Sequence, residues 1–363
     1  MESSIGDMVW LEECLKQAKQ MGASEVHLIE DRPVRYRVDG ELHKGTGEKL
    51  PESTIRDWLN DALTETQKAA YKENGELTFT VTKDGLFRMR VQAYRQSTGD
   101  AACLHLLPLC PPTTEELLIP EKICELLQQK RGLFLIAGAS GAGKTTTMAA
   151  LMGALLKGSG KKITALEANT EYLYHIEEGN TSLLVQRETA SHTKTMATGI
   201  KTALLQDSDV ITVSGLDGAE SLEAAVRAVE MGRLVLAIVD AEDSFLAIET
   251  LLSYVDEQNV AKMQQRLANA LIGGMSQRLL PRENGTGRVA AYAYYRNTDG
   301  VKNLLREGKM GALASMLQSG ERVEGMSMED AVYELYMQSV ISSEMAVYYA
   351  PDPKEMQRKV RLF

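Results

Sequence analysis

Residues 133–145, LFLIAGASGAGKT, decide the fold of this chain. The apolar run 133–137 is typical of a buried strand, and residues 146–156 are typical of a helix. Between them, residues 138–145 fit the pattern G-x-x-x-x-G-K-[ST]. A strand, a glycine-rich loop and a helix in this order predict a phosphate-binding P-loop (Walker A motif), whereas a glycine-rich turn without a ligand would need neither flanking element.

The predicted loop can hold the phosphates of a nucleotide. Its glycines let successive backbone N–H groups point at phosphate oxygens, and the N-terminus of the following helix adds a favourable potential. Lys144 is expected to reach the β- and γ-phosphates, and the hydroxyl of Thr145 is the expected ligand of Mg²⁺. We therefore predict that the loop binds Mg-ATP through Gly138, Ala139, Ser140, Gly141, Ala142, Gly143, Lys144, Thr145 and Thr146.

Length and composition indicate a globular protein with room for two domains. The chain has 363 residues, of which 44% are hydrophobic and 25% are charged. Its net charge of -10 disfavours nucleic acid as the main partner. The first residues carry acids and no apolar core of a secretory signal, and the apolar run at 234–239 is far below the ~20 residues of a membrane helix. We expect a cytoplasmic protein without a membrane span.

The cysteines and histidines show no pattern of disulfides or of a metal site. The four cysteines form no CxxC pair and are expected to be reduced thiols: Cys14, Cys103, Cys110 and Cys124. Four of the histidines lack the spacing of metal ligands and are expected to serve surface or core packing: His27, His43, His175 and His192.

A proline-rich segment divides the chain. Residues 107–120 contain Pro108, Pro111, Pro112 and Pro120 and are expected to form a linker. Residues 1–106 predict a small α+β domain with a helix that ends at Gly22. Its expected strands and turns are residues 25–30, 34–38, 77–82 and 86–94, with turns at Asp39-Gly40 and Asp84-Gly85.

Residues 121–363 predict a different architecture, in which strands alternate with helices. This alternation indicates a parallel sheet with crossover helices. The expected strands are residues 133–137, 162–166, 210–213 and 234–239. The expected helices are residues 145–156, 193–205, 219–231 and 261–272, followed by a mostly helical part from about residue 298.

Several segments outside the loop carry a further resemblance. They are GASEVHL (22–28), YRVDGEL (36–42), VQAY (91–94), QRE (186–188), GRVAA (287–291) and VKNLLREGK (301–309). Together with the loop they resemble, in the same order from about residue 10 to 345, the twitching-motility ATPases of the PilT family, which belong to the type II/IV secretion and type IV pilus motor ATPases.

That resemblance implies a fold, partners and a place in the cell. It implies a PAS-like N-terminal domain, a RecA-like ATPase core and a hexameric ring that retracts pili. The ring would contain copies of this chain or other PilT-like subunits, and a pilus platform protein of the inner membrane is an expected partner. The chain would lie in the cytoplasm or bind peripherally at the inner face of the cell membrane.

The departures from the family lie at positions that would carry out hydrolysis. Residues 209–218 read DVITVSGLDG, and the family's glutamate after the Walker B strand falls on Gly215. Losing a general base typically costs about 10²–10⁴ in rate. The family's acidic box reads EANTE at 167–171, and Glu171 is expected to assist Mg²⁺ or the attacking water. A shifted alignment would instead give the Walker B role to Asp209, Asp217 or Glu220, and Asp240 or Glu171 are alternative bases.

Other family residues are replaced as well. The Gly-His and Leu-His pairs are Gly232-Arg233 and Val239-Asp240. Two arginines that the family offers to a neighbouring subunit's nucleotide fall on Thr98 and His105. Because an arginine supplied in this way can contribute about 10³–10⁵ to phosphoryl transfer, its loss should slow turnover.

These observations favour one function over two others. We expect an ATP-binding subunit with impaired hydrolysis and a regulatory or accessory role. The alternative is a fully active motor that retracts pili, and a small-molecule kinase is disfavoured because the resemblance extends far beyond the loop. Lys144 and Glu171 are the candidate catalytic residues, and Thr145 and Glu171 are the candidate ligands of Mg²⁺.

Overall fold

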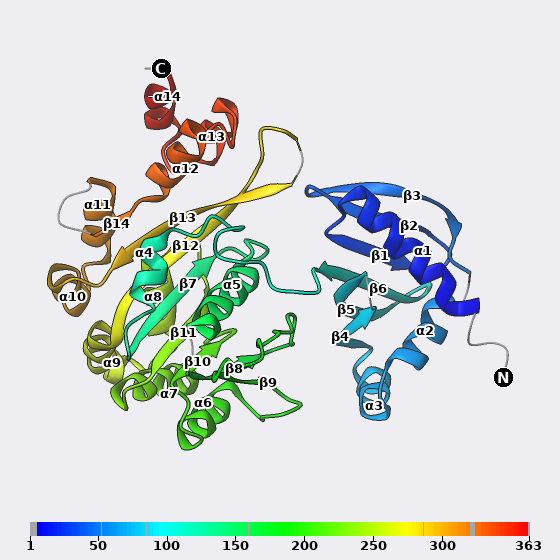
Figure 1. Ribbon diagram of the computed structural model, residues 1–363, viewed down its shortest axis with the longest axis horizontal. Coiled ribbons are helices and arrows are strands. Elements are labelled where there is room, and N and C mark those ends of the chain that lie inside the picture. Colours follow the sequence, from blue (N-terminus) through cyan, green and yellow to red (C-terminus); the bar gives the residue numbers. More distant parts are fainter. Residues whose placement is uncertain are drawn as a thin grey trace. The chain divides into compact units, whose positions relative to one another are not determined.

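The computed structural model describes residues 6–51, 53–83, 86–158, 160–285, 287–319 and 324–361. It divides the chain into two compact units, each described by itself (Figure 1). Unit 1 comprises the described residues up to Pro111 together with Asn169–Tyr174. Unit 2 comprises Pro112–Ala168 and the described residues from His175 onward. The predicted linker, residues 107–120, contains the first boundary between the units, at Pro111 and Pro112, and a second passage from unit 1 to unit 2 follows Tyr174.

Unit 1 is built on a 6-stranded antiparallel sheet with the order β3-β2-β1-β6-β5-β4. Its strands are β1 (Glu25–Ile29), β2 (Pro33–Val38), β3 (Glu41–Lys49), β4 (Glu76–Lys83), β5 (Phe87–Gln96) and β6 (Gly99–Leu107). Its helices are α1 (Gly6–Met21), α2 (Thr54–Ala62) and α3 (Glu65–Asn74).

Side chains alternate between the two faces of this sheet, as the period of two in a strand requires. Val26 and Leu28 of β1 are buried in a core that also holds Leu15 of α1 and Leu59 of α2. The neighbouring positions on β1 are only half-buried and lie on the opposite face. One face of the sheet therefore packs against helices, and the other carries polar side chains.

The predicted elements of this unit are present with small shifts of their ends. The turn at Asp39-Gly40 is confirmed, and both residues have the positive φ that a tight hairpin turn requires. The predicted turn at Asp84-Gly85 lies outside the described residues. The elements predicted from the sequence do not include β3, β6, α2 or α3.

Unit 2 is built on an 8-stranded sheet with the order β14-β13-β12-β7-β11-β10-β8-β9. Its strands are β7 (Gly132–Gly138), β8 (Lys162–Glu167), β9 (Leu183–Glu188), β10 (Val210–Val213), β11 (Leu234–Asp240), β12 (Leu271–Pro281), β13 (Arg288–Arg296) and β14 (Gly325–Met326). The strands from β12 through β7 to β9 run parallel, which confirms the predicted parallel strands.

The sheet is nevertheless mixed, which corrects the expectation of a parallel sheet. β13 pairs antiparallel with β12, and β14 pairs antiparallel with β13. A short connection returns the chain from Pro281 to Arg288, so the two strands can pair only in opposite directions. The helix predicted to reach residue 272 ends at Ala270, where the chain enters β12.

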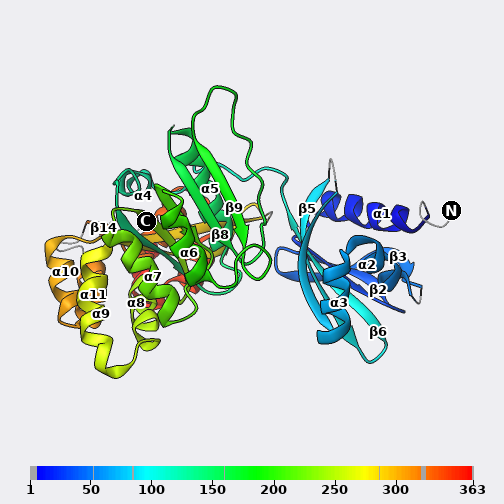
Figure 2. The same ribbon diagram turned by 90° about the horizontal axis from the view of Figure 1, so that it is seen from below.

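Helices cover both faces of the sheet of unit 2 (Figure 2). On one face, a core of alternate residues such as Leu133 and Leu135 packs against the helices α6 to α11. On the other face, Thr212 of β10 donates a hydrogen bond to the sulfur of Met152 in α5. The helices are α4 (Glu121–Leu126), α5 (Lys144–Lys157), α6 (Met196–Leu205), α7 (Ala219–Glu230), α8 (Ser244–Ser253), α9 (Glu257–Ala270), α10 (Asp299–Arg306) and α11 (Met310–Ser319).

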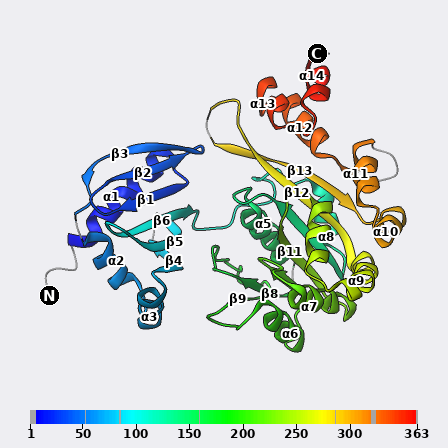
Figure 3. The same ribbon diagram turned by 180° about the vertical axis from the view of Figure 1, so that it is seen from behind.

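The remaining helices confirm a helical C-terminal region. They are α12 (Met328–Met337), α13 (Ser343–Tyr349) and α14 (Pro353–Arg361). Figure 3 shows them gathered beside β12 and β13, where Leu280, Val289 and Ala291 join their core. None of the described helices has the length and the apolar composition that crossing a membrane requires.

The close pairing of β12 with β13 predicts a strict need for glycine at residue 273. A Cβ at that position would collide with the carbonyl oxygen of Tyr295. We expect Gly273→Ala to lower the free energy of unfolding by about 1–3 kcal/mol, because backbone would have to move. Thermal unfolding followed by circular dichroism measures the change.

The matched control is Gly153→Ala in α5, where an added Cβ meets nothing within 4 Å. Alanine favours a helix over glycine, so this variant should unfold at the wild-type temperature or above it. Equal destabilisation by both substitutions would contradict the assigned pairing.

Candidate functional site

The predicted P-loop lies at the carboxyl end of β7, which is flanked in the sheet by β12 and β11. Its three glycines, Gly138, Gly141 and Gly143, all have positive φ, which side chains other than glycine rarely adopt. A Cβ on Gly138 would also lie 3.0 Å from the carbonyl oxygen of Gln277. The strand before the loop and the helix after it are both present, and Gly143 precedes the first turn of α5.

Lys144 is buried and held by three oxygen atoms. Its Nζ donates hydrogen bonds to the carbonyl oxygens of Gly138 and Ala139, each at 2.8 Å. The same Nζ lies 2.9 Å from Oδ1 of Asp240, whose side chain is 82% exposed. Asp240 ends β11 and is paired with Gly138 across β7 and β11. The exposed carboxylate of Asp240 thus forms an ion pair with the ammonium group that would contact a phosphate.

Gln277 of β12 supports the loop from within the core. Its Nε2 donates a hydrogen bond to the carbonyl oxygen of Ala142 at 2.6 Å. Its Oε1 is buried and has no hydrogen-bond partner among the described residues. No pattern in the sequence singles out this residue, because the contact joins positions that are 135 residues apart.

The end of β10 carries no carboxylate at the predicted Walker B position. Ser214 accepts a hydrogen bond from the backbone N–H of Ala168, which ties β10 to the end of β8. Gly215 follows, and a Cβ there would meet nothing within 4 Å. The position has room for a side chain and has none.

Two of the alternative acids can be placed on the sheet. Asp209 precedes β10 and accepts a hydrogen bond from the backbone N–H of Lys162 at the start of β8. It therefore lies at the amino ends of parallel strands, at the edge opposite the P-loop, and cannot act there. Asp217 lies beyond the carboxyl end of β10 and is exposed.

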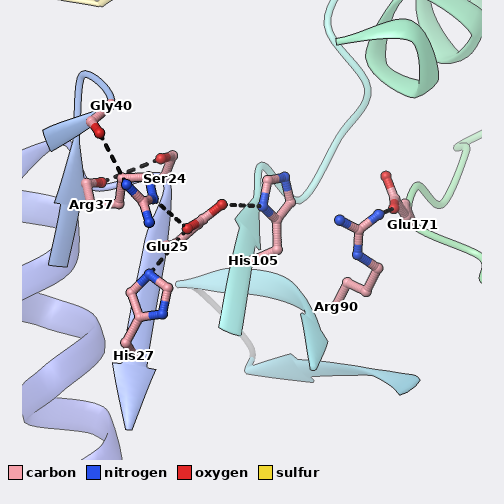
Figure 4. A network of polar contacts seen from close by, with 8 residues as sticks. All are labelled: Ser24, Glu25, His27, Arg37, Gly40, Arg90, His105 and Glu171. Carbon is pink, nitrogen blue, oxygen red and sulfur yellow. Dashed lines mark hydrogen bonds and ion pairs between the residues drawn. The ribbon is translucent and has the colours of Figure 1, made fainter. Parts of the chain in front are cut away.

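Glu171 belongs to unit 1, whereas Lys144 and Thr145 belong to unit 2. The Glu171 carboxylate is buried and forms an ion pair with Arg90 of β5 (Figure 4). Arg88, also on β5, donates a hydrogen bond at 3.0 Å to the carbonyl oxygen of Thr170. Two arginines therefore hold this segment, and the roles of Glu171 in catalysis and metal binding stay predictions.

A cavity of about 240 Å³ adjoins the P-loop within unit 2. Gly143 and Thr146 line it from the loop and α5, and Leu279 lines it from β12. Tyr292 of β13 also lines it and donates a hydrogen bond to the carbonyl oxygen of Leu117 at 3.2 Å. Burial raises the pKa of Tyr292 to about 12, so its hydroxyl stays protonated at neutral pH. The phosphate loop thus opens beside a partly apolar space.

Known proteins resemble the chain over nearly its whole length. Residues 3–359 match the sequence model of a family described as type II/IV secretion system proteins. The uncharacterized protein YggR of Escherichia coli (strain K12) is 35% identical over 314 residues, which are 86% of this chain and 94% of YggR. The type IV pilus ATPase PilU of Pseudomonas aeruginosa is 28% identical over 351 residues, 97% of this chain and 91% of PilU. The likeness therefore extends through both units.

A solved structure shares the fold. The crystal structure of the pilus retraction motor PilT with bound ADP matches the chain with a TM-score of 0.81 and 32% identity. The match covers 95% of this chain and 98% of that one. The predicted fold class is thereby confirmed: an N-terminal α+β domain, a RecA-like core and a helical C-terminal region. The resemblance to PilT is confirmed with it.

Proposed function

The chain belongs to the family of type II/IV secretion system proteins, and from this we propose that it is an ATP-binding subunit of a pilus or secretion motor with impaired hydrolysis. One observation carries the proposal. A complete phosphate loop around Lys144 shares its sheet with a strand, β10, after whose end Gly215 offers no carboxylate.

The loop supports ATP as the ligand. Its glycines adopt the positive φ that lets backbone N–H groups turn toward phosphate oxygens, and Lys144 supplies the positive charge. The adjoining cavity would receive the nucleoside. The proposed ligand of Mg²⁺ in the loop is the hydroxyl of Thr145, at the start of α5. When bound, Mg²⁺ would neutralise phosphate charge.

Three side chains that the family uses in hydrolysis are replaced in this chain, and their loss supports slow turnover. Gly215 cannot polarise water, and the trans-acting arginines of the family are Thr98 and His105 here. Thr98 is exposed in the turn between β5 and β6, and its hydroxyl accepts a hydrogen bond from Gln96 at 2.7 Å. Each of these parts contributes to stabilising a phosphoryl-transfer transition state.

The proposed role is regulatory or accessory. The chain would join a hexameric ring of its own copies or of PilT-like subunits in the cytoplasm or at the inner face of the cell membrane, and a platform protein of the inner membrane is the proposed partner. The second candidate, an active retraction motor, is favoured by the likeness to the retraction motor PilT over 95% of the chain. In that case Asp240, whose carboxylate already meets Lys144, is the candidate base.

The first prediction concerns nucleotide binding. Lys144→Ala should weaken binding of Mg-ATP at least about 10-fold, because charge-assisted hydrogen bonds to phosphate are lost. Fluorescence titration with a labelled, non-hydrolysable ATP analogue measures the affinity. The control is Lys157→Ala, at the exposed end of the same helix, which should bind as wild type does. Unchanged binding by Lys144→Ala would refute the phosphate-loop assignment.

The second prediction concerns hydrolysis. Wild-type turnover should lie near background, and Gly215→Glu should raise it at least about 10-fold, since a general base contributes about 10²–10⁴ in rate. Phosphate release under steady-state conditions measures this. Gly218→Glu places the same charge at another open position and should give no gain. Brisk wild-type turnover that Lys144→Ala abolishes would favour the motor instead.

The third prediction concerns Asp240. Asp240→Asn should strengthen Mg-ATP binding by about 2–10-fold, because Lys144 loses a competing, solvent-exposed carboxylate and the phosphates lose a like charge. The gain should shrink at high salt, which screens exposed charges. Glu242→Gln, an exposed neighbour, is the control. Weaker binding by Asp240→Asn would show that the carboxylate assists the nucleotide, and a fall in turnover would identify it as the base.

A further inference from the structure

The polar face of the sheet in unit 1 gathers side chains that the linear sequence keeps apart. β1 pairs antiparallel with β6 so that Glu25 lies opposite His105 and His27 lies opposite Cys103. Because side chains on a strand alternate, all four lie on the same face, while Val26 and Leu104 between them enter the core. The pairing therefore makes a two-by-two group of metal-ligating residue types.

The ligand atoms in this group lie close together. One carboxylate oxygen of Glu25, one ring nitrogen of His27 and the sulfur of Cys103 all lie within 4.8 Å of one another. His27 Nε2 is 3.1 Å from Glu25 Oε2, and His105 Nδ1 is 3.7 Å from Glu25 Oε1 (Figure 4). Ligands on a tetrahedral zinc ion are separated by about 3.3–3.8 Å, given bonds of about 2.0–2.3 Å. Small side-chain rotations would bring these ligand atoms to bonding distance of a single ion.

We propose that Glu25, His27 and Cys103 bind a zinc ion on this face, with His105 as the fourth ligand. The donor set selects the metal: thiolate and imidazole suit zinc, whereas Mg²⁺ and Ca²⁺ prefer oxygen ligands alone. A site with four protein ligands is typical of structural rather than catalytic zinc. The bound ion would cross-link β1 and β6, the two central strands of the sheet.

Zinc binds imidazole as a neutral ring and cysteine as a thiolate. Burial, followed by the charge of Arg90, lowers the pKa of His105, whereas the carboxylates of Glu171 and Glu25 act in the opposite direction. Burial raises the pKa of Cys103 to about 11, and the charges of Arg37 and Arg90 act in the opposite direction. Zinc binding would displace the thiol proton to solvent and leave a thiolate.

Arg37 would hold the ligand Glu25 in place without itself binding the ion. Its Nε donates a hydrogen bond to Glu25 Oε2 at 2.7 Å, and its Nη1 donates one to the carbonyl oxygen of Gly40 at 3.0 Å. A partner of this kind orients a ligating carboxylate. The guanidinium also repels a cation, but Zn²⁺ with one carboxylate and one thiolate forms a neutral core. The repulsion should lower the affinity without abolishing binding.

Cobalt substitution tests the site without recourse to ATP. Co²⁺ added to the full chain, free of nucleotide, should produce a thiolate-to-cobalt absorption band that saturates at one equivalent and disappears when Zn²⁺ is added. The band should be lost in Cys103→Ala and retained in Cys110→Ala, whose thiol is exposed. Absence of the band in wild type, or its survival in Cys103→Ala, would overturn the proposal.

A second pair of variants distinguishes loss of the zinc site from unfolding of the protein. His27→Ala should weaken Zn²⁺ affinity at least about 10-fold in calorimetric titration, whereas His43→Ala, exposed on β3, should not change it. Circular dichroism and binding of the ATP analogue by unit 2 should be the same in all variants. Equal Zn²⁺ affinity in wild type and His27→Ala would refute the site and leave the proposed function untouched.

Discussion

The register between β7 and β11 is the constraint on which the rest of unit 2 depends. It sets Gly138, where the phosphate loop begins, directly beside Asp240, where β11 ends. The residues of β7 are buried on both faces, so a slip of one residue would drive core side chains to the wrong face. The loop, Lys144 and the carboxylate that contacts it are therefore held by the packing of the whole core rather than by local contacts alone.

This arrangement explains how binding and hydrolysis can be separated in one protein. The phosphate cradle comes from β7, its loop and the first turn of α5. The side chain that would polarise water comes from the end of β10, which is separated from β7 by β11. Because each function draws on a different strand, glycine at residue 215 leaves the cradle intact. The proposed subunit can thus keep its nucleotide while turning it over slowly.

Local features of the sequence predicted the loop, its strand and its helix, because a glycine pattern between two periodic segments has its physical cause within a few residues. Features that depend on distant pairing were missed. The return of β13 beside β12 makes the sheet mixed, and Gln277 reaches Ala142 only because β12 pairs with β7. Likewise, His27 and Cys103 become neighbours only when β1 pairs with β6, so their spacing in the chain indicates nothing about metal binding.

The identity of the nucleotide that remains bound tests the central claim most directly. The purified chain would be mixed with a slight molar deficit of Mg-ATP, held for many minutes, freed of unbound nucleotide and denatured, and the released nucleotide would be separated by chromatography. The account predicts that ATP is recovered in nearly the amount bound. Recovery of ADP in its place would show that the chain hydrolyses ATP without the missing carboxylate and would contradict the account.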